Sequence, residues 1–310
     1  MTDIAFASAT ELAQRIRSRQ IGCRELLEHY LDRVERLNPQ VNAVVVRNFG
    51  PARAAADAAD AALARGESLG PLHGVPMTIK ESFHLTGTPT TFGFPAFRDN
   101  IATSNATVVQ RLMGAGAVIF GKTNVPPGLM DGQSWNEVYG RTNNPWDLGR
   151  TPGGSSGGSA AALAAGLSGL ELGSDIASSI RNPAHYCGLF GHKPTWGIAP
   201  QTGHMLTPVR QPTDIAVVGP LARSAADLEL ALKIIAGPDG EEAQAWSLAL
   251  PEPRQASLKD FRVAVVSQDG FAEVDGPVRD QIEALGDFLA REGAQVSRDA
   301  RPDFDSHALY

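Results

Sequence analysis

The chain has 310 residues, of which 43% are hydrophobic and 20% charged, with a formal net charge of −7. This composition is typical of a soluble globular protein rather than a disordered or membrane one, and no apolar stretch approaches the length of a membrane span. The acidic balance and the lack of a Lys/Arg cluster argue against a nucleic-acid partner and favour a small-molecule one.

The N-terminal residues and the two cysteines indicate the cellular compartment in which the protein is expected. The chain begins Met1-Thr2-Asp3-Ile4 and is polar again by Thr10, without the basic start and apolar run of a secretory signal, so we expect it in the cytoplasm. Cys23 and Cys187 show neither CxxC nor Cys/His ligand spacing. We therefore predict no disulfide framework, no metal site and a packing role for both cysteines.

Helical patterns dominate the first sixty-odd residues. Ser8 and Glu11 fit a capping box at the start of one helix, and helix-like stretches follow at about 24–37 and 52–65. We predict a helical N-terminal segment.

From Gly74 the pattern alternates between strand and helix. The β-prone runs 75–79 and 117–120 flank a helical stretch at 105–113. A loop rich in Asn, Pro, Gly and Ser then leads into an alanine-dense helix at 159–166, and another helix is predicted at 224–235. Such alternation is typical of an α/β sheet.

The last seventy or so residues have a different pattern. We predict a polar surface excursion at 238–258, a buried strand at 261–266, a helix at about 277–291 and one more short strand. We interpret 1–310 as a single domain in three parts: N-terminal helices over 1–68, a catalytic core over 69–236, and the excursion with its later strand and helix over 237–310.

Two serine-rich glycine segments, at 153–159 and 173–181, carry the clearest chemical signal, together with Lys80 in the apolar run 74–80. A hydroxyl is a poor nucleophile at neutral pH unless a base takes its proton, and a lysine is such a base only where burial keeps its amine neutral. The pattern therefore proposes a serine nucleophile activated by lysine.

Ordinary interpretations stand beside this one. A lone lysine at a strand end is more often a surface residue, and Gly153-Gly154-Ser155-Ser156-Gly157 also matches the GxSxG nucleophile elbow of α/β-hydrolases. In that alternative Ser155 is the nucleophile and His185, His192 or His204 its partner. The elbow leaves both Lys80 and Ser179 unexplained.

Several ordered blocks resemble the amidase signature family, serine hydrolases of amide bonds that use a Ser-Ser-Lys triad. Besides the two serine segments, the blocks are Pro71-Leu72-His73-Gly74-Val75-Pro76, Gly121-Lys122-Thr123-Asn124, Asn144-Pro145-Trp146-Asp147, Lys193-Pro194-Thr195 and Gly219-Pro220-Leu221-Ala222-Arg223. The resemblance implies an α/β fold with a mixed central sheet, helices on both of its faces and an N-terminal helical segment.

The resemblance also implies roles for individual residues. Lys80 is similar to the family's catalytic lysine, Ser155 to the serine that follows a cis peptide bond, and Ser179 to the nucleophile. The oxyanion hole would be formed by the backbone amides of Ile176, Ala177, Ser178 and Ser179. The side chains of Asp175 and Arg181 would support the loop that carries these amides.

For function, the resemblance implies a hydrolase of amides, and of carbamates or esters, that needs no cofactor or metal. The alternative is an amidase-like subunit that hydrolyses glutamine within a tRNA-dependent transamidation complex. No membrane and no direct nucleic-acid contact are expected, and homo-oligomerisation is left open.

Two departures from the family pattern predict reduced function. The family commonly places two glycines before the nucleophile, where this chain has Ala177-Ser178, so a position that needs positive φ would be strained. Family members also continue well beyond the position of Tyr310. A truncated or inactive scaffold, with uncovered apolar surface and an incomplete sheet and pocket, is therefore a third interpretation.

Overall fold

The structure is a computed structural model that describes residues 3–204, 213–240, 242–270, 272–303 and 308. Two compact units emerge, Met1–Leu248 and Ala249–Tyr310, and each is described by itself. The expected single domain, with a catalytic core that ends at residue 236, stays a prediction.

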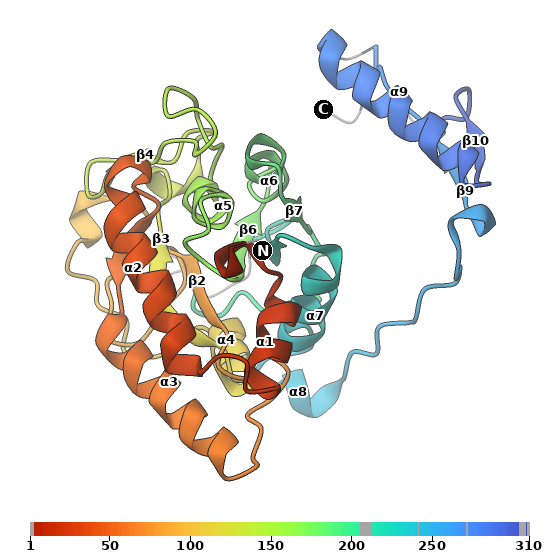
Figure 1. Cartoon of the computed structure of the whole chain (residues 1–310). Coiled ribbons are helices and arrows are strands. Elements are labelled where there is room, and N and C mark those ends of the chain that lie inside the picture. The colour runs from red at the N-terminus through yellow and green to blue at the C-terminus, as the bar shows by residue number, and fades with distance from the viewer. Residues whose placement is uncertain (1–2, 205–212, 241, 271, 304–307, 309–310) are drawn as a thin grey trace. The chain divides into compact units, whose positions relative to one another are not determined.

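A mixed sheet forms the centre of the first unit (Figure 1). Its strand order among the described residues is β1-β3-β2-β6-β8-β7, and β2 runs parallel to both of its neighbours, β3 and β6. The outer pairings are antiparallel. The strands are β1 Val44–Arg47, β2 Pro76–Lys80, β3 Val118–Thr123, β6 Glu171–Asp175, β7 Phe190–Gly191 and β8 Val217–Ala222.

Helices lie on both sides of this sheet, as the sequence predicts. The α-helices of the first unit are α1 Ala9–Arg17, α2 Cys23–Val41, α3 Phe49–Ala64, α4 Thr107–Gly114, α5 Gly157–Ala164, α6 Arg181–Cys187, α7 Ala225–Ile235 and α8 Glu242–Ala245. Shorter elements are the 3-10 turns Ile4–Phe6, Pro95–Phe97 and Pro127–Leu129 and the hairpin of β4 Trp135–Asn136 with β5 Gly140–Arg141.

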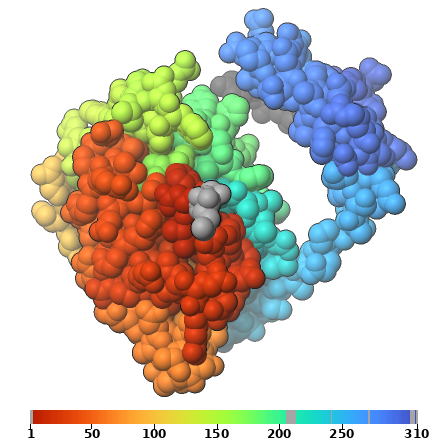
Figure 2. Space-filling view, viewed as in Figure 1, coloured from red at the N-terminus to blue at the C-terminus, as the bar shows by residue number. Residues whose placement is uncertain are grey.

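The N-terminal helices form because their apolar faces cover the sheet. Ser8 caps α1, since its Oγ accepts the Glu11 amide at 3.1 Å. Leu27 and Tyr30 of α2 are fully buried, and the Tyr30 ring stacks on Phe120 of β3 with 6.4 Å between centroids. Burial of this apolar area stabilises the layer by roughly 25 cal/mol per Å². Figure 2 shows these red and orange segments covering one face of the unit.

The sequence does not predict several of the strands, among them β1, β6 and β8. β1 interrupts the N-terminal residues that we expected to be helical, and its four residues are too short a run to show a period. β6 (Glu-Leu-Gly-Ser-Asp) carries polar residues at three of its five positions, without alternation, although every one of its residues is buried. β8 contains Pro220, which argued against a strand inside a sheet.

The second unit is a small β-α-β arrangement. β9 Arg262–Ala264 pairs in parallel with β10 Gln295–Ser297, α9 Gly276–Arg291 connects them, and a 3-10 turn spans Leu258–Asp260. The buried strand that we predicted at 261–266 is wrong in its burial: Phe261 and Val266 are exposed, and only Val265 is buried. A two-stranded sheet with one helix covers little apolar area.

Across the described part of the chain, no helix combines the length and apolar character that a membrane span requires.

Candidate active site

Lys80 is the last residue of β2 and is completely buried. β2 lies between β3 and β6, so it is paired on both edges and Lys80 is at the centre of the sheet. The Lys80 Nζ atom donates to Ser155 Oγ at 2.6 Å and to Ser174 Oγ at 3.0 Å. The lysine and one of the predicted serines are therefore in direct hydrogen-bond contact.

The electrostatics of Lys80 suit a base. Burial lowers the pKa of Lys80 to about 7, although the Asp175 carboxylate pulls it in the opposite direction. Removing a charged amine from water disfavours its protonated form, so a large share of this lysine is neutral at neutral pH. The ordinary interpretation of Lys80 as a surface residue is wrong.

Ser155 lies in the glycine-rich loop that leads into α5. A cis peptide bond joins Gly154 to Ser155, as the resemblance implies. The loop packs tightly, because a Cβ placed at Gly154 would lie 2.1 Å from the Asp131 carbonyl oxygen, and one at Gly158 would lie 2.2 Å from the Asn124 amide nitrogen. Glycine at these positions lets the backbones approach closely enough to bring Ser155 to Lys80.

Ser179 lies on the second loop, between β6 and α6. This loop is tied to the first one, since the Ser156 amide donates to the Ser179 carbonyl at 3.1 Å. Asp175, at the end of β6, accepts the amides of Ser178 and Ile180 at 2.8 and 3.0 Å. The two serine segments of the sequence thus meet in space at the end of the parallel strands.

Asp175 and Arg181 form an ion pair at this second loop, and the supporting role that the resemblance implies for them stays a prediction. The Arg181 guanidinium donates to both carboxylate oxygens of Asp175, at 3.0 and 2.9 Å. Burial pushes the pKa of Asp175 up, but the hydrogen bonds from Arg181 and from three backbone amides outweigh it and hold this pKa at about 2. Asp175 therefore remains a carboxylate and keeps accepting from the loop.

Ser178 departs from ordinary backbone geometry. Its φ is +80°, in the left-handed region where residues with a Cβ are disfavoured, whereas Ala177 is not in that region. The Ser178 amide is already donated to Asp175. Within the described residues, the backbone amides of Ile176, Ala177 and Ser179 donate to no protein acceptor, so they are available to bind an oxyanion. The oxyanion-hole role of these three amides and of the Ser178 amide stays a prediction.

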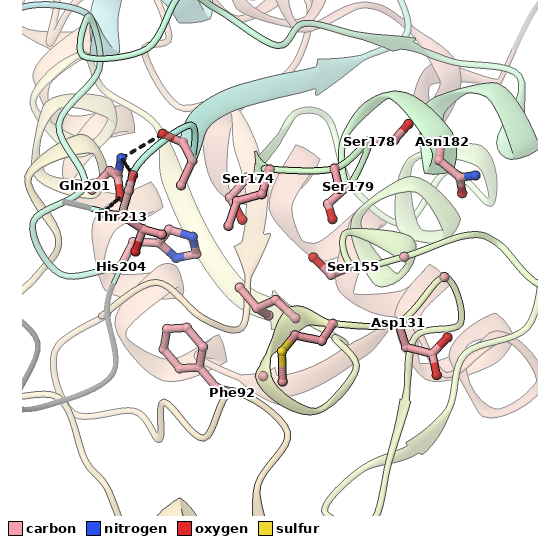
Figure 3. A pocket seen from close by; sticks show the side chains of 18 residues that line it. Phe92, Asp131, Ser155, Ser174, Ser178, Ser179, Asn182, Gln201, His204 and Thr213 are labelled. Atoms are coloured by element: carbon pink, nitrogen blue, oxygen red, sulfur yellow. Dashed lines mark hydrogen bonds between the residues drawn. The ribbon is translucent and has the colours of Figure 1, made fainter. Parts of the chain in front are cut away.

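A cavity of about 550 Å³ opens in front of these loops. Ser155 and Ser179 both line it, and Figure 3 shows their hydroxyl ends close together at its edge. Lys80 is behind Ser155 and does not line the cavity itself. The remaining walls are mainly apolar and come from the loops after β2 and β3, the β6–α6 loop and the segment that precedes β8. Their larger apolar members are Phe92, Leu129, Met130 and Ile176.

A second buried lysine was not singled out from the sequence as a functional residue. Lys122 on β3 is also completely buried, and its Nζ donates to the Pro89 carbonyl and, at 2.9 Å, to Thr90 Oγ1. Glu81 accepts the amides of Thr91 and Phe92 at 2.6 and 3.1 Å. These two charged residues fix the loop that brings the Phe92 ring to the cavity, and no short-range sequence signal predicts this.

The histidines of the elbow alternative are dispersed. His185 and His192 do not line the cavity, and His204 lines it with its Nδ1 3.4 Å from the Ser82 carbonyl oxygen. Among the described residues, no histidine makes a hydrogen bond to Ser155, whose partner is Lys80. The geometry favours the lysine-activated interpretation.

The fold and this arrangement of residues agree with comparisons to known proteins. The family model described as Amidase matches residues 25–308, so the chain belongs to the amidase family, and the resemblance inferred from the sequence is confirmed. Fatty acid amide hydrolase, a solved structure, superimposes with a TM-score of 0.87 at 31% identity over 97% of this chain and 53% of its own. The predicted amidase signature fold is confirmed as well.

Two curated relatives extend the comparison. An acylamidase of Rhodococcus erythropolis is 42% identical over 95% of this chain and 62% of its own length. A glutamyl-tRNA(Gln) amidotransferase subunit of Acidothermus cellulolyticus is 39% identical over 98% of this chain and 60% of its own length. The chain thus spans about three fifths of the length of these relatives.

Proposed function

We propose that the protein hydrolyses carbon–nitrogen bonds of small amides through an acyl-enzyme on Ser179, with Ser155 and Lys80 relaying protons. The observation that carries the proposal is the 2.6 Å contact from the buried Lys80 amine to Ser155, in a cavity that Ser179 also lines. Similarity to an acylamidase and to fatty acid amide hydrolase supports the same class of reaction.

The proposed first half-reaction moves one proton along the three side chains. Neutral Lys80 accepts the hydroxyl proton of Ser155, Ser155 accepts that of Ser179, and the Ser179 Oγ forms a bond to the substrate carbonyl carbon. Negative charge then develops on the carbonyl oxygen, where the amides of Ile176, Ala177 and Ser179 would stabilise it. When the C–N bond breaks, the proton returns through Ser155 to the departing amine.

Water completes the reaction by the reverse path. It loses a proton to the Ser155–Lys80 pair and attacks the acyl carbon. When the bond from the acyl carbon to Ser179 Oγ breaks, the acid is released and the proton returns from the pair to Ser179. Carbamates and esters carry a similar carbonyl and belong to the same substrate panel. Cytoplasmic residence remains a prediction.

A second candidate is a glutamine-hydrolysing subunit of a transamidation complex, favoured by the similarity to the glutamyl-tRNA(Gln) amidotransferase relative. Among the described residues that line the cavity, none is Lys or Arg to pair with the α-carboxylate of glutamine. We therefore rank this candidate second. Glutamine hydrolysis that appears only when the other components of such a complex are added would reverse the order.

The test is covalent labelling with a fluorophosphonate, read by intact mass and peptide mapping. One adduct on Ser179, absent in Ser179→Ala and present in Ser156→Ala, is the expected result, because Ser156 donates to the Ser174 carbonyl rather than to Lys80. An adduct on Ser155 would favour the nucleophile elbow. A folded sample without any adduct would support the inactive scaffold.

A further inference from the structure

His204 lies on the cavity wall and is held in one orientation by two aromatic rings. Its imidazole stacks on Phe83 with 4.3 Å between centroids and an interplanar angle of 25°, and on Phe92 with 5.9 Å and 22°. Phe92 has a φ of +50°, and Glu81 holds it there by accepting its amide. Figure 3 shows the His204 ring beside Phe92 at the cavity, on the other side from Asp131.

The neighbours of the ring determine which nitrogen carries the proton. His204 Nδ1 lies 3.4 Å from the Ser82 carbonyl oxygen, and a carbonyl only accepts hydrogen bonds, so Nδ1 is the protonated nitrogen. Nε2 is then an acceptor in the neutral ring. Within the described part of the chain, no protein donor contacts this nitrogen.

The ring remains neutral at the pH values where an amide hydrolase works. Burial, with smaller contributions from the nearby Lys80 and His84, lowers the pKa of His204 to about 3. His204 therefore neither donates from Nε2 nor acts as a base at neutral pH. Its chemistry toward a ligand is that of a fixed acceptor.

Gln201, another polar residue on this wall, is already satisfied. Gln201 Nε2 donates to the carbonyl of Ala216 at 2.7 Å and to that of Thr213 at 3.3 Å, and Gln201 Oε1 accepts the Thr213 amide at 3.2 Å. Across the cavity the walls are mainly apolar. Because His204 lines this cavity, an apolar ligand beside its Nε2 acceptor would leave that nitrogen without a hydrogen bond.

We propose that His204 is a specificity-determining residue that accepts a hydrogen bond from an N–H or O–H donor on an otherwise apolar, uncharged amide substrate. A buried acceptor that loses water and gains no donor is costly, so a site of this kind discriminates against the isostere that lacks the donor. This inference rests on the proposed amide hydrolysis and names the class of substrate that the cavity would take.

The test compares pairs of amide substrates that differ by one group. In one series a hydroxyl on the acyl part is replaced by methyl, and in a second series the same exchange is made on the amine part; products are quantified by chromatography. We expect kcat/KM in at least one series to favour the hydroxyl compound at least tenfold, which corresponds to about 1.4 kcal/mol.

The variant His204→Phe retains a ring between Phe83 and Phe92 but has no acceptor. Its ratio of kcat/KM between the two substrates should fall to about one, while His185→Phe, at an exposed histidine outside the cavity, should keep the wild-type ratio. A ratio taken within one variant cancels changes in the amount of active enzyme. His204→Gln, which restores an acceptor oxygen, supplies the comparison if the phenylalanine variant does not fold.

Three results would overturn the proposal: a wild-type ratio near one in both series, an unchanged ratio in His204→Phe, or a ratio that collapses between pH 8 and pH 5.5. The last result would show a histidine that titrates in this range. Fluorophosphonate labelling of Ser179 in the same samples separates these outcomes from failure of the proposed hydrolysis, because labelling needs no donor on the reagent.

Discussion

Lys80 and Lys122 lie on adjacent strands, and both are completely buried, yet their surroundings differ. Lys80 donates to two serine hydroxyls, of Ser155 and Ser174, and both serines line the cavity. Lys122 donates to a backbone carbonyl and a threonine next to the carboxylate of Glu81. Burial lowers the pKa of Lys80 to about 7 and that of Lys122 to about 8.

The comparison teaches that burial alone does not make a lysine a catalytic base. Lys80 contacts the hydroxyl of Ser155, which lines the cavity, whereas Lys122 contacts the Pro89 carbonyl and the Thr90 hydroxyl, neither of which lines it. Each cluster also supports a loop with a non-glycine residue at positive φ, Ser178 near Lys80 and Phe92 near Lys122. One cluster is therefore expected to act in chemistry and the other in architecture.

The largest expected effect separates the two lysines by activity. Lys80→Met should lower kcat/KM for an amide by about 10²- to 10⁴-fold, the range that general-base catalysis contributes, because no other base contacts Ser155 among the described residues. Lys122→Met should retain a much larger share of activity. Steady-state kinetics on folded variants, corrected by active-site titration, is the measurement. Equal losses in the two variants would contradict the comparison.

The next-largest effect concerns stability. Here Lys122→Met should lose more free energy of unfolding than Lys80→Met, the reverse of their order in activity. Lys122→Met leaves Glu81 buried without its nearby cation, and breaking a buried charge arrangement in this way costs about 3 to 5 kcal/mol. Denaturant unfolding should show that loss, while Lys80→Met should stay close to the wild type. Lys122→Met paired with Glu81→Gln removes both charges and serves as the control, since it should recover part of the lost free energy of unfolding.

The pH dependence of labelling tests the assignment of Lys80. With a pKa of about 7, Lys80 is protonated in acid and cannot accept the Ser155 proton, so the fluorophosphonate rate should rise with pH and level off above about 7. Lys122→Met should keep this midpoint. A rate that does not change between pH 5.5 and 8.5 would rule out Lys80 as the base.

The lowered pKa of Lys80 also predicts how the free energy of unfolding changes with pH. The folded pKa of Lys80 lies below its ordinary value of 10.5, so between about pH 7 and 10.5 the unfolded chain binds more protons and the free energy of unfolding rises with pH. Lys80→Met should flatten this rise. Chemical denaturation at several pH values within the window measures the slope for both proteins, and identical slopes would argue against a depressed pKa.

The smallest expected effect concerns the β6–α6 loop, which contains Ala177 and Ser178. Ser178→Gly should raise the free energy of unfolding by about 1 kcal/mol, because glycine adopts the observed φ of +80° without strain. Ala177→Gly is the matched control at a position without positive φ, and it should destabilise by about 0.5 to 1 kcal/mol. Thermal or denaturant unfolding of the pair decides the matter, and the same sign for both would mean that the backbone angle is not responsible.

The sequence by itself determined the family and the residues that meet at the site. Ordered blocks around Lys80, Ser155 and Ser179 were enough, and glycines such as Gly154 and Gly158 in these blocks permit the close backbone packing of the site. The helices of the N-terminal segment also followed from their apolar period, which reflects a single buried face.

Only the tertiary structure decided which charged and polar residues are buried and what they face. The sequence does not predict β6, because its buried polar side chains find hydrogen-bond partners that are distant in the sequence. Ser174, for example, accepts a hydrogen bond from Lys80. The different hydrogen-bond partners of Lys80 and Lys122 likewise depend on contacts between residues distant in the sequence. The same holds for the tautomer of His204, which lies between two aromatic rings. Local patterns record propensity and period, whereas the pKa and hydrogen-bonding role of a side chain are set by what surrounds it.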